Sequence, residues 1–265
     1  MGYIQRLVLT VDKELFDDEI YFWKNAMGMR VTREVKGDGG RKSVIFAFGQ
    51  ETLNADDGGK AAVELREGPS GARALGNGLS YISLTVPYGV RVSRIYESGG
   101  ELVYGFGYFD VRSPSGYSVR AQVAARRDPL ELVAVNVPDV KAAEKYYADT
   151  FGMVGRAPLD TNGYAPKSPP GSRLMTYGEP KETMGILLQP LAAAVEDATE
   201  GLKVGDVYRG VVCVAADSAK GGGARSGGSD VAGYGFEVEE YGAWEDAVKK
   251  GAKALPAKYN APPAV

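Results

Sequence analysis

The strongest constraint on the fold is an internal repeat. Residues 6–31 and 130–155 share one layout: an alternating apolar segment, an acidic turn, and an amphipathic segment that ends in Met-Gly-Met or Phe-Gly-Met. Apolar side chains recur at helical spacing after each turn, namely Phe16, Ile20 and Trp23 in the first copy and Val140, Ala143 and Tyr147 in the second. Each copy is therefore predicted to contain a strand followed by a helix, and the chain contains a duplication.

Two shorter segments repeat the same plan. Residues 77–122 show a strand pattern, a helix pattern, a Gly-Gly stop and further strands, and residues 206–242 begin and end in the same way but are shorter in the middle. We therefore expect an α+β fold of four βαβββ modules joined two and two, with a truncated fourth module. The break is expected near residues 125–130, which gives an N-terminal domain of residues 1–127 and a C-terminal domain of residues 128–265 with a tail.

The absence of histidine limits the chemistry of the chain. Among 265 residues there is none, so catalysis by Ser-His-Asp or Cys-His groups and zinc binding by imidazoles are excluded. Any proton transfer must use Glu, Asp, Lys or Tyr with a shifted pKa.

Charge and apolar patterning narrow the partners. The formal net charge is -3 and no strand or helix carries a dense basic stripe, so nucleic acid is not an expected partner. No apolar stretch approaches the ~20 residues of a membrane span. The single cysteine, Cys213, lies in an apolar run and is expected to be a small buried residue. We expect a soluble protein of a reducing intracellular compartment, either the cytoplasm or an organelle matrix or stroma.

A set of motifs connects this plan to a known family. The helix ends "FWKNAMGM" and "YYADTFGM", the strand "GNGLSYISLTV" and the hairpins "SPSGYSVRA" and "DVAGYGFEV" occur along the chain. In this combination the chain resembles the vicinal oxygen chelate superfamily, the glyoxalase I-like proteins, in its fused two-domain form. The resemblance implies that paired modules form cups, in which one side chain from each module binds a divalent metal. That metal stabilises an enediolate while a glutamate moves the proton.

The resemblance pairs module one with module four and places metal ligands at positions that this sequence fills differently. The first-strand position falls on Arg6, and strand alternation would point the neighbouring Gln5 away from the cup unless the register slips. Glu64 keeps the closing position of module one, while Arg209 and Glu237 stand at the two positions of module four. Because arginine is not a metal ligand, two carboxylates beside two guanidiniums predict ion pairs.

Modules two and three are expected to share the other cup. Tyr81 and Arg120 stand where the family has His and Glu, and the third module offers Leu132 and Leu188, with Gln189 as the nearest polar alternative. This set supplies no ligand for a divalent ion, so we expect Arg120 to be structural or to face an anion. We expect neither a metal nor another cofactor.

Three classes of function stay open. The first is a glyoxalase-like protein without the metal site that acts as a non-catalytic ligand-binding or assembly component, whose partner is a small molecule or a protein assembly. Its ligand-contacting residues would be Arg6, Arg209, Tyr81 and Arg120. The second is an active lactoylglutathione lyase-type enzyme that uses Glu64 and Glu237 as acid and base, with an arginine stabilising the enediolate oxygen. The third is a metal-free resistance-type protein that sequesters an aromatic cation. The altered cups favour the first class.

Overall fold

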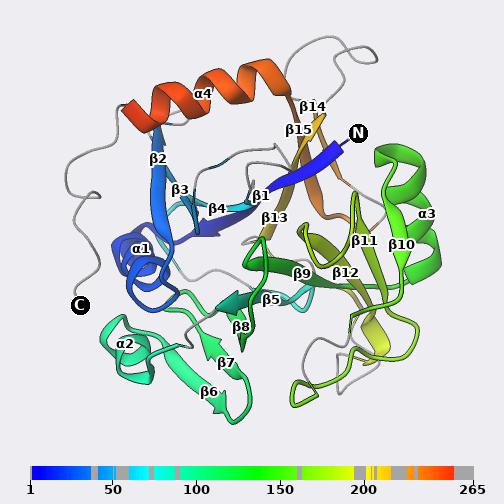
Figure 1. Cartoon of the computed structure of the whole chain (residues 1–265), viewed down its shortest axis with the longest axis horizontal. Coiled ribbons are helices and arrows are strands. Elements are labelled where there is room, and N and C mark those ends of the chain that lie inside the picture. Colours follow the sequence, from blue (N-terminus) through cyan, green and yellow to red (C-terminus); the bar gives the residue numbers. More distant parts are fainter. Residues whose placement is uncertain are drawn as a thin grey trace.

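A computed structural model of the chain shows four modules that share two sheets (Figure 1). The structure describes residues 2–36, 41–49, 51, 60–71, 75–86, 90–159, 163–193, 201–203, 205, 208–215, 226–229 and 232–253. Within these residues, no helix combines the length and the apolar character needed to cross a bilayer.

Modules one and three have the same order of elements. The first module contains β1 (Gly2–Val11), η1 (Lys13–Leu15), α1 (Phe16–Asn25), β2 (Arg30–Lys36), β3 (Lys42–Ala47) and β4 (Ala62–Glu67). The third contains β9 (Leu130–Val137), α3 (Val140–Phe151), β10 (Val154–Arg156), β11 (Arg173–Thr176), β12 (Gly185–Pro190) and η3 (Leu191–Ala193). The repeat read from the sequence is thus a repeat of βαβββ units.

Modules two and four are the shorter copies. The second contains β5 (Leu79–Val86), α2 (Val92–Glu97), β6 (Glu101–Gly105), β7 (Phe109–Arg112) and β8 (Ser118–Val123). The fourth contains β13 (Tyr208–Ala215), β14 (Ser226–Ser229) and β15 (Gly235–Glu240), and is followed by α4 (Tyr241–Lys253). Residues 216–225, between β13 and β14, lie outside the described residues, so the truncation of this module stays a prediction.

The strand order pairs the modules as the family resemblance implied. The first sheet has the order β14-β15-β13-β1-β4-β3-β2 and joins modules one and four. The second has the order β10-β11-β12-β9-β5-β8-β7-β6 and joins modules two and three. Each sheet therefore combines one module from residues 1–127 with one module from residues 128–265. The domain boundary at residues 127 and 128 stays a prediction.

Each sheet has an apolar face toward a shared core and a more polar second face. In β5 the buried side chains of Ile82 and Leu84 belong to the core cluster, while Tyr81 and Ser83 alternate with them on the opposite face. The same core takes in residues of both sheets and of helices α1 and α3, including the fully buried Trp23. This main core takes in described residues of all four modules and therefore holds them together.

Each of the four first strands carries a β-bulge where it pairs with its partner module. In the β1–β13 pair, Gln5 and Arg209 have no opposite residue, and in the β9–β5 pair the extra residues are Glu131 and Ser80. A bulge inserts one residue and re-aims the side chains beside it. The duplication therefore extends to backbone detail that the sequence alone did not predict.

A pair of tyrosines links the two sheets in equivalent places. Tyr117, which follows the turn before β8, donates its hydroxyl proton to the Thr10 carbonyl at 2.7 Å, and Tyr234, just before β15, donates to the Asn136 carbonyl at 2.6 Å. Both rings are almost fully buried. Each bond joins modules that lie in different sheets.

We expect Tyr117→Phe and Tyr234→Phe each to lower the free energy of unfolding by about 1–2 kcal/mol, because each removes one donor to a buried carbonyl without leaving a large cavity. Urea denaturation measures this, and Tyr96→Phe at an exposed ring is the matched control. Stability of either core variant equal to that of Tyr96→Phe would contradict a linking role for the hydroxyl.

Candidate functional site

The first cup is the polar face shared by β1, β4 and β15, with Arg6, Glu64, Arg66 and Glu237. Arg6 and Glu64 are only 3% and 5% exposed. The Nε atom of Arg6 donates to Glu64 Oε2 at 2.5 Å, so the Glu-Arg ion pairs predicted for this cup include Arg6 with Glu64. A charge-assisted bond of this kind is among the strong hydrogen bonds of proteins.

Glu237 pairs with a residue that the sequence reasoning missed. Arg66 Nη1 donates to Glu237 Oε1 at 2.6 Å and Nη2 donates to Oε2 at 3.0 Å, while its Nε donates to Glu64 Oε1 at 2.7 Å. One guanidinium thus bridges two carboxylates from modules one and four. Arg66 follows Glu64 by two residues in β4, and this spacing places both side chains on one face of a strand.

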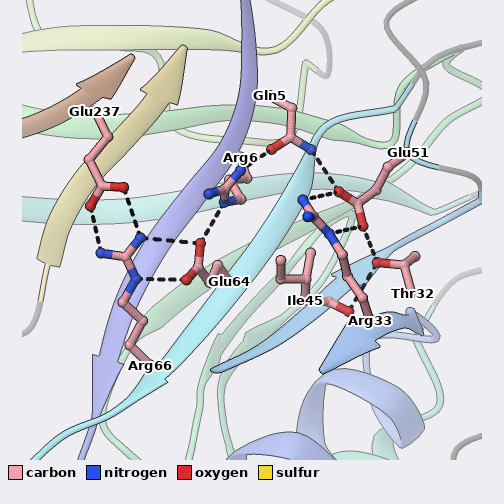
Figure 2. A network of polar contacts seen from close by, with 9 residues as sticks. All are labelled: Gln5, Arg6, Thr32, Arg33, Ile45, Glu51, Glu64, Arg66 and Glu237. Carbon is pink, nitrogen blue, oxygen red and sulfur yellow. Dashed lines mark hydrogen bonds and ion pairs between the residues drawn. The ribbon is translucent and has the colours of Figure 1, made fainter. Parts of the chain in front are cut away.

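The polar cluster continues along the sheet through Gln5 (Figure 2). The Nη1 atom of Arg6 donates to Gln5 Oε1 at 2.7 Å, and Gln5 Nε2 donates to Glu51 Oε2 at 3.0 Å. Glu51 also accepts from Arg33 Nη2 at 2.9 Å and from the Thr32 hydroxyl. The bulge at Gln5 is the register slip that the sequence analysis named as a condition for this residue to join the cup.

Guanidinium and carboxylate groups alternate through this cluster. In order, the contacts join Glu237, Arg66, Glu64, Arg6, Gln5, Glu51 and Arg33. The charges of the arginines and glutamates cancel, so the cluster is neutral as a whole. Neutral, mutually bonded groups of this kind are the arrangement that buried charges require.

The C-terminal helix covers part of this cluster. Helix α4 contacts β2, β13 and β15, and Figure 1 shows it lying across the first sheet from β15 toward β2. A Cβ atom added at Gly251 would lie 2.8 Å from the Cβ atom of Arg33, so the glycine permits close approach of helix and side chain. The helix of the C-terminal tail therefore packs on its own chain.

Neighbouring arginines lower the pKa of Glu64. Burial raises the pKa of this carboxyl, but Arg6 and Arg66 outweigh that effect and lower the pKa to about 2. A carboxylate with such a low pKa is a weak base at neutral pH. The low pKa therefore makes Glu64 unsuited to abstract a proton at neutral pH.

Arg209 lies one residue away from the position that the resemblance assigned. It forms the bulge in β13, which corresponds to Ser80 in β5, and Gly210 is the residue in register with Tyr81. The side chain of Arg209 lies outside the described residues, as does that of Cys213. The bulge shifts the count along the strand by one, which sequence alignment does not detect.

In the second sheet, Arg120 lies among aromatic rings. Its Nε and Nη2 atoms donate to the two carboxylate oxygens of Asp110 at 2.8 and 3.0 Å. Its guanidinium carbon lies 4.3 Å from the ring centroid of Tyr81 and 5.3 Å from that of Tyr108. The bidentate pair and the cation–π contacts fix the orientation of Arg120.

The second cup is a cavity of about 290 Å³ over β5, β8 and β9. The side chains from these strands are Tyr81, Ser83, Arg120, Gln122, Glu131 and Leu132. The opposite wall comes from residues 158–159 and 165–172, a segment with four prolines. This volume lies near the lower end of the roughly 300–1,000 Å³ of small-molecule sites. Tyr81 and Arg120, predicted as ligand-contacting residues, both line the cavity.

Glu131 is the carboxylate of this cavity and was not predicted. It is 5% exposed, accepts from the Ser83 hydroxyl at 2.6 Å, and lies 3.7 Å from Arg126 Nη1. Its place in β9 is the bulge that corresponds to Gln5 in β1. Simple strand alternation assigns the cup face to Leu132, so only knowledge of the bulge could have identified Glu131.

The two cups fill equivalent positions with opposite chemistry. Leu132 and Leu187 stand in the register of Arg6 and Glu64, and they lie in a small apolar cluster on the cup face. Leu187 therefore takes the closing position that the resemblance had assigned to Leu188, which is buried in the main core. The same scaffold accommodates an ion pair in one sheet and an apolar pair in the other.

The side chains of the two cups do not fit a divalent metal. In the first cup both carboxylates already accept hydrogen bonds from guanidiniums, and the second cup offers one carboxylate beside a leucine and an arginine. Within the described ranges there is no group of three or more Asp, Glu, Cys or His side chains arranged around one point. Divalent ions such as Zn²⁺ and Ni²⁺ need several free oxygen, nitrogen or sulfur ligands.

Comparison with solved structures identifies the fold. Glyoxalase I from Zea mays superposes with a TM-score of 0.73 at 18% identity over 95% of this chain and 96% of that chain. A putative dioxygenase from Bacillus subtilis subsp. subtilis str. 168 superposes with a TM-score of 0.61 at 12% identity over 97% and 92% of the two chains. No protein-family model matches the sequence, and no curated protein matches it.

Both similarities extend over almost the whole chain, so they concern the complete four-module arrangement and not one module. The mixed α+β architecture and the pairing of the modules agree with what the sequence motifs and the family resemblance predicted. The chain therefore has the fold of glyoxalase I, in a four-module form that extends over almost its whole length.

Proposed function

We propose that this chain is a metal-independent, non-catalytic protein that binds a small organic ligand in the second cup. The observation that carries the proposal is the contrast between the cups. The first cup is filled by its own ion pairs, whereas the second encloses a cavity with a polar floor. Polar groups converging on a concave and partly apolar site are typical of ligand binding.

The proposal assigns Glu64 and Glu237 a structural role. Each carboxylate is engaged by a guanidinium, and the pKa of Glu64 is about 2. A lyase of the glyoxalase type needs a base that takes a proton near neutral pH and a positive centre for the enediolate oxygen. Arg6 and Arg66 supply positive charge, but Arg66 already donates to Glu64 and Glu237, and Arg6 already donates to Glu64 and Gln5.

The ligand site is tested by filling the cavity. We expect Leu159→Trp, a change in the loop wall, to abolish binding of small polar organic fragments detected by ligand-observed NMR, because the indole takes up cavity volume. Val154→Trp, at an exposed position of β10, is the matched control and should bind the fragments like the unchanged protein. Equal binding by both variants, or no fragment binding at all, would refute a ligand site in the second cup.

The metal proposal is tested with the unchanged protein. After incubation with Ni²⁺, Zn²⁺, Mn²⁺ or Co²⁺ and dialysis, we expect no stoichiometric retention of any ion, because no set of free ligands is present in the described residues. We also expect no lactoylglutathione from methylglyoxal and glutathione. An ion that is retained by the unchanged chain but lost in Glu64→Gln/Glu237→Gln, or steady turnover, would support the lyase alternative instead.

A further inference from the structure

The floor of the second cup carries a positive and a negative side chain that do not pair with each other. Arg120 bonds to Asp110, and Glu131 bonds to Ser83 and lies near Arg126. Both charged groups line the same cavity. The cavity therefore presents one positive and one negative group on its floor.

Strand order explains why the two charges stay apart. Arg120 is the neighbour of Ser83 across the β5–β8 pair, while Glu131 reaches the hydroxyl of Ser83 from β9 on the other side. Strand β5 lies between them, and neighbouring strands are about 4.8 Å apart. A ligand that spans the floor can contact both groups, although the groups themselves remain bonded to other partners.

The positive group is preorganised for a planar anion. Asp110 uses the Nε and Nη2 atoms of Arg120, so Nη1 is not part of that pair. The rings of Tyr81 and Tyr108 hold the guanidinium plane. A fixed guanidinium loses little conformational entropy when it binds a carboxylate, so its orientation favours this interaction.

The negative group has room for a further donor. Among the described residues, the donors that contact Glu131 are Ser83 at 2.6 Å and Arg126 at 3.7 Å. The second distance exceeds the ~2.7–2.9 Å of a charge-assisted hydrogen bond. A ligand ammonium would complete the coordination of this buried carboxylate.

Part of the remaining wall is apolar and stiff, although Lys167, Ser168 and Ser172 also line it. Leu132 and Leu159 face the cavity together with prolines, namely Pro158, Pro166, Pro169 and Pro170. The Ser172 hydroxyl donates to the Pro169 carbonyl at 2.7 Å and closes the turn of this segment. Proline fixes backbone φ, so the wall is preformed for an apolar group.

We propose that the ligand of the second cup is a small zwitterion with an apolar side chain, of the α-amino acid class, whose carboxylate meets Arg120 and whose ammonium meets Glu131. This inference rests on the proposed ligand-binding function and names the class of ligand. A zwitterion suits a floor whose own charges are largely compensated, because it brings no net charge into a site of low dielectric constant.

Matched compounds test each charge separately. Isothermal titration would compare L-leucine with 4-methylpentanoate, which lacks the ammonium, and with 3-methylbutylamine, which lacks the carboxylate. Corresponding sets are made for L-valine and L-phenylalanine. We expect the tightest-binding amino acid to bind with about tenfold or more higher affinity than either of its truncated analogues, since each analogue lacks one charge-assisted contact.

Single substitutions then assign the poles. Arg120→Gln should lower the affinity for the amino acid by about tenfold and leave the affinity for the amine unchanged. Glu131→Gln should lower the affinity for the amino acid by the same factor and leave the affinity for the acid unchanged. The exposed ion pair between β6 and β7 supplies matched controls, Arg112→Gln and Glu101→Gln. Both should leave the affinities for the amino acid, the acid and the amine unchanged. Arg120→Lys provides a second test at that position if the glutamine variant does not fold.

The outcomes separate this inference from the function on which it rests. If fragments bind and Leu159→Trp blocks them, but no amino acid binds better than its acid and its amine, the zwitterion is wrong and the ligand site stands. An acid that binds as tightly as the amino acid would indicate an anion site formed by Arg120 and Lys167. If neither fragments nor amino acids bind, both proposals fail.

Discussion

Replacing Arg6 by leucine is expected to lower the free energy of unfolding by about 3 kcal/mol, because Glu64 would stay buried with one fewer partner. The bond that disappears joins Arg6 Nε to Glu64 Oε2 at 2.5 Å, and Gln5 Oε1 loses a donor as well. Arg66 still reaches Glu64 at 2.7 Å, which keeps the cost at the lower end of the range for a broken buried pair. The urea midpoint and slope measure the effect.

The second sheet provides the design for recovery. Leu132 and Leu187 occupy the register of Arg6 and Glu64, so the double variant Arg6→Leu/Glu64→Leu copies a pair that the same scaffold already accepts. We expect it to regain most of the loss, since replacing a buried ion pair by apolar side chains is often neutral or stabilising. Arg66 then keeps Glu237 as its partner.

Arg112→Leu, which breaks an exposed pair with Glu101, is the control for loss of an arginine and should cost at most about 1 kcal/mol. A double variant that is less stable than Arg6→Leu alone would show that the ionic cluster is not interchangeable with an apolar pair. An Arg6→Leu variant as stable as the Arg112→Leu control would show that this ion pair contributes nothing.

The repeats and hairpins predicted the fold because they reflect local physics. The spacing of Phe16, Ile20 and Trp23 buries one face of α1, and Ala143 and Tyr147 do the same in α3. The motifs also carry the family resemblance, and that resemblance implied which modules pair. The structure confirms the pairing of modules one with four and two with three.

The sites were harder to predict because they depend on single-residue shifts between strands. One extra residue at Gln5 turns this side chain into the first cup, and one at Glu131 brings a carboxylate into the second. Alternation along a strand assumes an unbroken register, so it favoured Leu132 over Glu131. The bulge depends on tertiary pairing, which one strand considered alone does not reveal.

Other parts of the sites come from contacts across long distances in the chain. Arg66 could have been suggested by its spacing from Glu64, but its contact with Glu237 joins residues 171 positions apart. Residues 165–172 line one wall of the second cup, although their composition suggests only an irregular segment. The sequence therefore predicted Tyr81 and Arg120 as cup residues without revealing that they line a cavity.

Acid should remove the stabilising contribution of Glu64. Its pKa is lowered from 4.5 to about 2 in the folded chain, because the effect of Arg6 and Arg66 exceeds that of burial. A lowered folded-state pKa gives stability that is fully present above the unfolded-state value of 4.5 and is lost as pH falls from there through about 2. A shift of this size corresponds to about 3 kcal/mol, at 1.36 kcal/mol per pKa unit.

The contribution of Glu64 is isolated by comparing the unchanged protein with Arg6→Leu/Glu64→Leu, which lacks this carboxyl, in urea denaturation at several pH values. The difference in stability between them should be constant near neutral pH and shift by about 3 kcal/mol against the unchanged protein as pH falls from 4.5 toward 2. Glu101→Gln controls for loss of an exposed carboxyl. A difference that stays constant down to pH 2 would mean that the guanidiniums do not hold Glu64 ionised, and the first cup would then lack the electrostatic coupling that closes it to a metal.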